Sequence, residues 1–398
     1  MATILLVFIY IGYVGLGIPD SLLGTAWPAI YVEFGVSVSA ANAVIVIISI
    51  GTLISSFLSG KLIKKMGTPL LVVISTFLTV VGLFGFFIAK NIFFLCLFGI
   101  PLGLGAGAVD AGINGYVAEK YSARQVNFLH CFYGIGVVIS PYLMSLAING
   151  GDWRRGYLYA GICQAIILLL LIISLPIWKK AHPENSEIKK ENLKVVKYST
   201  LFKTPSIRAT WVIFIVMCGI ELTAGTWCAT YLVSAKGISE GLAAKLAMCF
   251  YLGLTLSRFL TGVLTKKIPP FKAIIIGYVV LAVGIIVVAL SFNSLIVAVI
   301  GIFIIGLGTG PLFPSYVCLT PKHFGGEIFN AVVGTQTAFC YVGVLVLPAL
   351  FGFIAQPLGL YAFPYYIAVL WVILIIATAV LIKYLAKEKR AFYGKKYK

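Results

Sequence analysis

Residues 69–89 read PLLVVISTFLTVVGLFGFFIA and contain no charged side chain. A helix needs about 20 apolar residues to cross the hydrocarbon core of a bilayer, so this stretch predicts a membrane-spanning helix. Hydrophobic residues make up 61% of the chain and charged residues only 11%, against about 25% charged in soluble proteins. We therefore predict an all-α integral membrane protein. Twelve such stretches can be placed, at 4–30, 38–60, 69–89, 92–118, 126–149, 157–178, 208–234, 239–263, 271–290, 294–319, 327–354 and 361–385.

The basic residues predict the topology of these spans. The chain has 30 Lys and Arg and a net charge of +18. With the N-terminus inside, 24 of the 30 fall in cytoplasmic segments and five fall outside, which is the bias typical of membrane proteins. We expect both termini in the cytoplasm of a multi-pass plasma membrane protein of prokaryotic origin. The positive charge then reflects topology and contact with anionic lipid, and we expect no nucleic-acid partner.

The two halves of the sequence repeat each other. A Gly-rich run at 103–107 recurs at 306–310, and the basic stretch 59–65 recurs at 261–267, in the same order. The charged segment 179–207 divides the spans six and six. Repeats of this kind are typical of transporters that bind substrate at the midplane between the repeats. We predict an N-terminal six-helix bundle at 1–178, a cytoplasmic linker at 179–207, and a C-terminal six-helix bundle with a basic cytoplasmic tail at 208–398.

Three acidic residues lie inside the predicted spans: Asp20, Asp110 and Glu221. An acidic residue at a helix centre costs roughly 2.5–3.5 kcal/mol, and such residues are usually functional. The candidate bases inside the spans, His130 and Arg258, are too few to neutralise three acids. Three neighbouring carboxylates also resist simultaneous ionisation, so at least one is expected to hold a proton near neutral pH.

Helical spacing suggests which residues face a substrate. Asp20, Gly24 and Trp27 follow i, i+4, i+7 and share one helix face. An acidic, small and aromatic stripe suits a sugar, because the indole stacks on its apolar face and the carboxylate accepts hydroxyl hydrogens. The predicted substrate-binding residues are Asp20, Trp27, Asn114, Asn127, Glu221, Trp227, Gln336 and Tyr341.

Other polar residues suggest proton coupling and gating. Asp110 and His130 lie on the two arms of a predicted helical hairpin, where a carboxylate–imidazole contact would carry a proton near physiological pH. The alternative for His130 is an ordinary buried hydrogen bond. Glu221 is a third candidate, either for the proton or for a cation that replaces it. We assign the gate to Lys64, Lys65 and Arg258. The eight cysteines lack metal-type spacing, so we expect no metal site and no cofactor.

These features resemble the fucose permease group of the major facilitator superfamily, the fucose–galactose–hexuronate type of proton symporter. The match rests on Asp20 to Leu23, the stretch 59–65, Gly103 to Asn114, the run NFLHCFYGIG at 127–136, and Glu221 to Tyr231. The resemblance implies the major facilitator fold, with twelve helices in two pseudo-symmetric bundles. It also implies that the acids of the first and fourth spans, here Asp20 and Asp110, serve substrate binding and proton coupling.

The chain departs from that group at three positions. His130 replaces an amide, Gly17 replaces an asparagine, and Lys64 replaces the aspartate of the usual superfamily motif. These departures leave the solute open, and sodium-coupled sugar carriers in the family leave the coupling ion open.

The leading hypothesis is therefore a secondary active transporter: a monomeric, proton-coupled symporter of a small polar solute such as a sugar, working by alternating access. The alternatives are a proton-driven exporter of organic cations and a sodium-coupled sugar carrier. The drug-antiporter pattern of Gly-Pro followed by paired glycines is missing at 140–143, which read SPYL. We expect no enzyme, because no nucleophile–base set or metal cluster is present.

Overall fold

The computed structural model describes residues 2–121, 123–181, 198–264, 267–292, 294–324 and 329–396. Every regular element in these ranges is a helix. In chain order they are α1 (Ala2–Asp20), α2 (Leu22–Phe34), the 3₁₀ turn η1 (Val38–Ala40), α3 (Ala41–Phe87), α4 (Ile92–Lys120), α5 (Ala123–Asn149), α6 (Arg154–Ala181), α7 (Tyr198–Lys203), α8 (Pro205–Lys236), α9 (Glu240–Leu264), α10 (Pro270–Ala289), α11 (Leu295–Thr309), α12 (Leu312–His323), α13 (Phe329–Leu358), the turn η3 (Leu360–Ala362) and α14 (Phe363–Lys396).

The described residues contain twelve segments long and apolar enough to cross a membrane, from Thr3–Phe34 to Leu360–Lys387. The predicted all-α class and the predicted number of spans are both confirmed. The physical reason is that hydrocarbon offers no hydrogen-bond partners, so each crossing segment must satisfy its backbone internally as a helix.

Two of these spans are broken near a proline. The first span divides at Ser21, between α1 and α2, and the tenth divides at Gly310 and Pro311, between α11 and α12. Proline lacks the N–H that continues a helical hydrogen-bond ladder, and Pro19 and Pro311 lie next to the breaks. The first break leaves Asp20 as the last residue of α1.

The second and third predicted spans meet without a loop. α3 runs through both, and its one non-helical residue is Gly67, with φ 79° and ψ 157°. Residues other than glycine rarely adopt this φ, so Gly67 lets the chain turn back in a single step.

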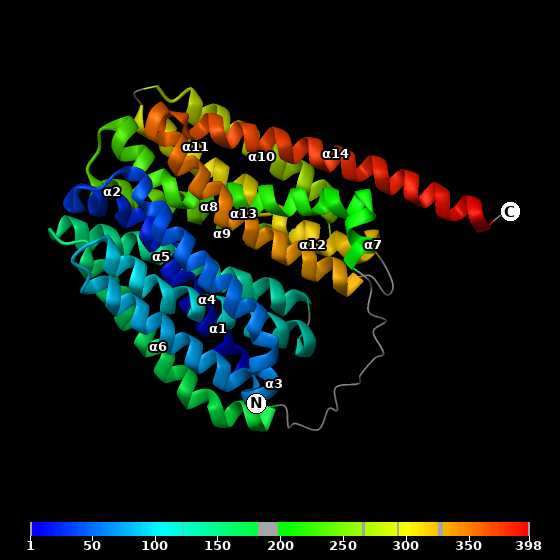
Figure 1. Cartoon of the computed structure of the whole chain (residues 1–398), viewed down its shortest axis with the longest axis horizontal. Coiled ribbons are helices and arrows are strands. Elements are labelled where there is room, and N and C mark those ends of the chain that lie inside the picture. The colour runs from blue at the N-terminus through cyan, green and yellow to red at the C-terminus, as the bar shows by residue number, and fades with distance from the viewer. Residues whose placement is uncertain are drawn as a thin grey trace.

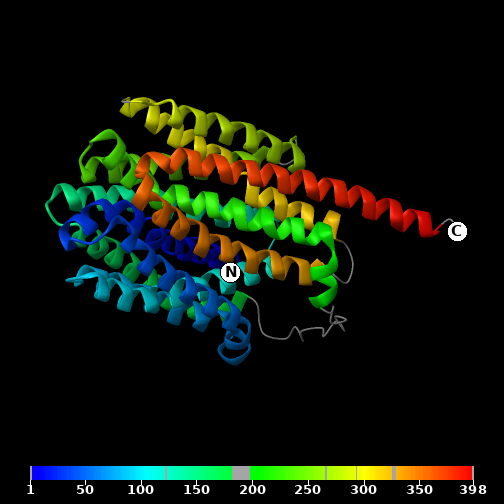
Figure 2. The same ribbon diagram turned by 45° about the horizontal axis from the view of Figure 1, so that its top comes forward.

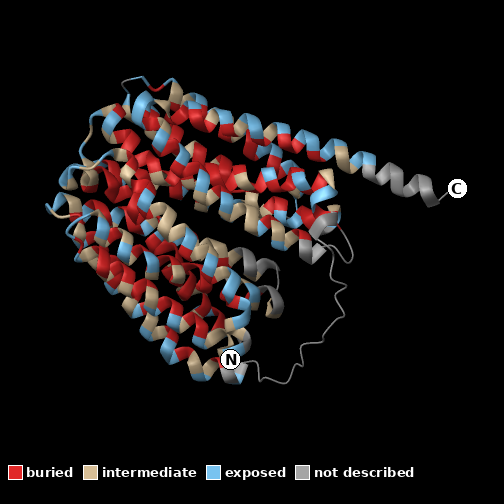
Figure 3. Cartoon of the chain, viewed as in Figure 1, coloured by how far each residue is buried: buried red, intermediate tan, exposed pale blue. Residues whose placement is uncertain are grey.

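The helices form two bundles side by side (Figures 1 and 2). We call α1–α6 the N-bundle and α8–α14 the C-bundle. Figure 1 shows both chain ends at the same side of the molecule, which we call the termini face. Buried residues fill the interior of each bundle, and exposed residues cover its outer surface (Figure 3).

The bundles touch at the face opposite the termini, along a contact that we call the seam. A Cβ atom on Gly24 would lie 2.6 Å from the carbonyl oxygen of Thr226, so two backbones meet there directly. Near it, the Asn42 amide donates a hydrogen bond to the Ala349 carbonyl at 2.9 Å. Ser145 Oγ donates to the Gly241 carbonyl at 2.7 Å.

Candidate functional site

A cavity of about 610 Å³ lies between the two bundles. Its wall includes Tyr121, directly after α4, Ile268, between α9 and α10, and Pro270, the first residue of α10, so it extends to the termini face. The seam closes its other end, because Gly24 and Thr226 also line it. Its polar wall comes from both bundles and includes Tyr13, Asp20, Asp110, His130, Tyr133, Glu221, Arg258 and Tyr341.

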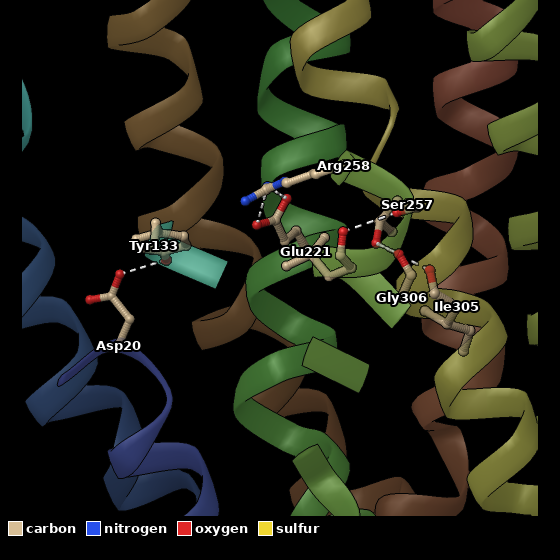
Figure 4. Close-up of polar contacts among 9 residues, drawn as sticks. Asp20, Tyr133, Glu221, Ser257, Arg258, Ile305 and Gly306 are labelled. Atoms are coloured by element: carbon tan, nitrogen blue, oxygen red, sulfur yellow. Dashed lines mark hydrogen bonds and ion pairs between the residues drawn. The ribbon is translucent and has the colours of Figure 1, made fainter. Parts of the chain in front are cut away.

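Asp20 reaches the cavity from the break in the first span. The Tyr133 hydroxyl of α5 donates to Asp20 Oδ2 at 2.7 Å (Figure 4). Two serine hydroxyls hold the break against α5: Ser140 Oγ donates to the Ile18 carbonyl at 2.7 Å, and Ser21 Oγ donates to the Val137 carbonyl at 3.0 Å. The sequence therefore builds a fixed kink that presents the carboxylate to the cavity, where we predicted it.

Asp110 is held by donors from three helices. Tyr13 Oη of α1 donates to Oδ1 at 2.6 Å, and the Asn114 amide of α4 donates to the same oxygen at 2.8 Å. Tyr341 Oη of α13, in the C-bundle, donates to Oδ2 at 3.2 Å. An ionised carboxylate only accepts hydrogen bonds, so this set of donors suits the charged form.

The expected contact between Asp110 and His130 is not formed. In the described part of the chain, no hydrogen bond joins the two side chains. Instead the His130 ring packs edge-on against the Tyr13 ring, with the centroids 5.8 Å apart. The prediction treated α4 and α5 as a simple hairpin, whereas α1 packs against both helices and places Tyr13 between them. His130 still lines the cavity.

Glu221 is paired with Arg258. The Nη2 atom of Arg258, on α9, lies 2.7 Å from both carboxylate oxygens of Glu221, on α8 (Figure 4). Both side chains are largely buried, with 11% of Arg258 and 16% of Glu221 exposed. The Arg258 guanidinium, which we predicted as part of the gate, extends to the cavity wall and pairs with Glu221.

Three residues predicted to bind substrate are buried away from the cavity wall. Trp27 donates from Nε1 to the Val38 carbonyl at 2.8 Å, and Trp227 donates to the Pro348 carbonyl at 2.9 Å; each is at most 1% exposed. Gln336 is 3% exposed and accepts from Thr320. Asp20 and Gly24 both line the cavity, as their shared helix face predicts, but Gly24 already lies at the seam, so Trp27, three residues further along α2, lies beyond the end of the cavity.

The other predicted residues have four different outcomes. Tyr341 lines the cavity as expected, and Asn114 supports Asp110 rather than lining the wall. Lys65 is exposed at the end of its span nearest the termini face. The side chains of Lys64 and Asn127 lie outside the described residues.

Sequence reasoning missed Tyr13 and Tyr133, which hold the two acids of the N-bundle. A signal was present: Tyr13 lies seven residues before Asp20, and Tyr133 lies three after His130, so each shares a helix face with a residue already selected. Tyrosine is common in apolar spans, and spacing alone did not single these two out.

Comparison with known proteins gives a consistent result. The family model described as Major Facilitator Superfamily matches residues 9–245 and 225–396. The chain is 22% identical over 385 residues to bypass of stop codon protein 6 of Saccharomyces cerevisiae, covering 88% of this chain and 77% of that protein. It is 20% identical over 354 residues to the glucose/mannose transporter GlcP of Bacillus subtilis, covering 82% and 86%.

Among solved structures, a D-xylose-proton symporter superposes with a TM-score of 0.75 at 15% identity, covering 96% of this chain and 97% of the symporter. A likeness at this identity shows the fold, which is the predicted major facilitator fold. The proteins that this chain resembles are transporters rather than enzymes, in agreement with prediction, and the sugar transporter among them is consistent with the resemblance to the fucose permease group. Since the family model covers almost the entire chain, the protein belongs to the major facilitator superfamily.

Proposed function

We propose that this protein is a secondary active transporter that carries a small polar solute, a sugar, together with a proton. The observation that carries the proposal is the cavity between the bundles, which the seam closes at one end and which bears two carboxylates that have no basic partner among the described residues. Such a cavity supports alternating access, in which the bundles rock about a central site.

The wall of the cavity suits a solute rich in hydroxyl groups. Carboxylates accept hydroxyl hydrogens, and the tyrosines that surround them both donate and accept. A volume of about 610 Å³ falls in the range of small-molecule sites, about 300–1,000 Å³. The likeness to a glucose/mannose transporter and to a D-xylose-proton symporter supports a sugar as the solute.

We assign different tasks to the two aspartates. Asp20 lies next to the seam and binds the solute, with Tyr133 orienting its carboxylate. We assign the proton to Asp110, because no basic group hydrogen-bonds to it among the described residues and because its donors come from both bundles, so that its charge can affect how the bundles are arranged. Glu221 binds the solute from the C-bundle, with its charge compensated by Arg258.

The orientation of the protein in the membrane follows from the distribution of its basic residues. In the predicted topology, the segments on the side of both termini contain 24 of the 30 basic residues, so we assign the termini face to the cytoplasm. The cavity then opens inward in this structure. The bundles 1–178 and 208–398, joined by the linker 179–207, rock about the central site, and the protein works as a monomer.

Transport in liposomes tests the proposal. The purified protein is reconstituted, and uptake of labelled sugars is measured with an imposed pH gradient, with an imposed sodium gradient, and with no gradient. We expect one or more sugars to be concentrated with the pH gradient alone, and a protonophore to abolish the effect. Accumulation with the sodium gradient alone would show that sodium, and not the proton, is the coupling ion. No sugar uptake, together with proton-driven efflux of a cationic dye, would instead identify an exporter of organic cations.

A further inference from the structure

One hydrogen bond between the bundles ends on a carboxylate. Tyr341 of the C-bundle lies 3.2 Å from Asp110 Oδ2 and 3.4 Å from Ser56 Oγ, and both of these partners belong to the N-bundle. The cross-bundle bonds of the seam, by contrast, end on the backbone carbonyls of Ala349 and Gly241. A backbone carbonyl keeps the same hydrogen-bonding role at every pH, whereas a carboxylate changes its role when it gains a proton.

Protonation of Asp110 would change the bond to Tyr341. As an ion, Asp110 accepts from Tyr13, Asn114 and Tyr341, and hydrogen bonds to a charged group are roughly twice as strong as neutral ones. A proton on Oδ2 would point at the Tyr341 oxygen, so that Tyr341 would have to accept this hydrogen and turn its own toward Ser56. The link between the bundles therefore weakens when Asp110 loses its charge.

Other titratable groups lie near the hydrogen bond between Tyr341 and Asp110. Among the described residues of α3, the Ser56 hydroxyl hydrogen-bonds to Tyr341, and Ser49 and Thr52 line the same cavity. Among the described residues, the titratable or charged groups that share the cavity wall with Asp110 and Tyr341 are Tyr13 and Asp20 of α1, Tyr121 after α4, His130 and Tyr133 of α5, Tyr157 of α6, Cys218 and Glu221 of α8, Arg258 of α9, Cys318 of α12 and Cys340 of α13.

We propose that Tyr341 is a positioning residue that couples the charge of Asp110 to the arrangement of the two bundles. When the proton leaves Asp110 toward the termini face, Tyr341 donates to the new carboxylate and holds the bundles in the arrangement seen here. When the proton returns, the bond weakens and the bundles part more readily. This inference rests on the proposed function only in giving the proton to Asp110.

Hydrogen exchange of the full-length protein tests the link without any solute. Wild type, Tyr341→Phe, Asp110→Asn and the double variant are compared by mass spectrometry at one pH. Losing a hydrogen bond to a charged group shifts the equilibrium between the two arrangements by roughly tenfold. We expect both single variants to exchange more slowly at residues 112–121, near the termini face, and faster at 236–243, near the seam. The double variant should exchange like the single variants, because both substitutions remove the same interaction.

Tyr366→Phe is the matched control. The Tyr366 hydroxyl donates to the Leu347 carbonyl at 2.8 Å within the C-bundle, so this variant loses a tyrosine hydroxyl without touching the link. The inference is overturned if Tyr341→Phe exchanges like wild type or like Tyr366→Phe. Should Asp110→Asn not fold, the exchange of wild type and Tyr341→Phe is compared at two pH values. The wild-type arrangement should then depend on pH, and that of Tyr341→Phe should not.

Transport assays separate this inference from the proposed function. Exchange of labelled for unlabelled sugar requires only movement of the loaded carrier, whereas net uptake also requires release of the proton. We expect Tyr341→Phe to lose at least about tenfold more of its proton-driven net uptake than of its exchange. Equal losses in both assays would overturn the coupling role. If wild type concentrates no sugar, the proposed function fails, and hydrogen exchange still decides whether Tyr341 responds to Asp110.

Discussion

The two bundles treat their buried acids in different ways. In the N-bundle, Asp20 and Asp110 accept hydrogen bonds from tyrosine hydroxyls and an amide, and no base contacts them among the described residues. In the C-bundle, Glu221 lies against Arg258 with both its oxygens engaged. Hydroxyl donors stabilise a carboxylate without cancelling its charge, whereas a guanidinium cancels it.

This difference means that Asp110 can change its charge during transport, whereas a change in the charge of Glu221 would cost much more free energy. Removing the charge of Glu221 would leave an unpaired cation in a largely buried place, and that cost holds the pair together. Removing the charge of Asp110 leaves no unpaired cation among the described residues. We therefore infer that the N-bundle carries the proton and that the C-bundle supplies a fixed, neutral wall.

The largest effect should follow from breaking the pair. Arg258→Met leaves Glu221 without its partner, and we expect the free energy of unfolding to fall by about 3 kcal/mol. Thermal unfolding in detergent measures this change. Arg258→Met combined with Glu221→Leu should recover most of the loss, because no lone charge remains. If the double variant is as unstable as the single one, the pair does not act by neutralisation.

The next effect concerns the proton. Asp110→Asn keeps the shape of the side chain but cannot carry a proton, so the sugar should equilibrate across the liposome membrane without being concentrated. Asp20→Asn, which we expect to raise the KM for the sugar, is the comparison. Continued accumulation by Asp110→Asn would move the proton to another group and end the contrast between the bundles.

A smaller effect is expected at the donor to Asp20. Tyr133→Phe removes a hydrogen bond to a charged group, worth about 1.5 kcal/mol at the low end, so the KM should rise about tenfold with little change in the maximal rate. Tyr10→Phe is the control, because its hydroxyl donates to the Gln125 carbonyl within the same bundle. A fall in the maximal rate alone would show that Tyr133 serves proton movement instead.

The smallest effect concerns a threonine near Glu221 to which we assign no role in transport. Thr223 lies two residues away on α8, is fully buried, and has no hydrogen-bond partner for its hydroxyl among the described residues. Thr223→Val removes an unsatisfied hydroxyl, and we expect the free energy of unfolding to rise by about 1 kcal/mol with unchanged transport kinetics. A loss of transport would give Thr223 a place in the site.

The fold was predictable because a bilayer restricts what a chain can do. Long apolar runs must form helices, so the number of spans follows from composition and length. The breaks at Ser21 and Pro311 were not predicted, since hydropathy averages over a window and does not respond to one missing hydrogen bond. Those breaks matter to function, because the first of them places Asp20 at a helix end.

The site was predictable in part. Its acids stand out because charge inside a membrane is costly, and that cost is visible in any single sequence. Their partners do not stand out. Glu221 and Arg258 lie on different helices 37 positions apart, and Tyr341 reaches Asp110 from the other half of the chain. Such neighbours depend on how helices pack, which no periodicity within one helix reveals.

The meeting of Gly24 with Thr226 has a consequence for the speed of the transport cycle. Where two proteins or bundles interlock through long side chains, separation requires many rotamers to change together. At Gly24 the backbone of one bundle contacts the backbone of the other at Thr226, so the two can separate there without a change of side-chain rotamers. A bulkier residue at position 24 would roughen that surface. In the transport cycle that we propose, we therefore expect the glycine to lower the kinetic barrier to separating the bundles at this point.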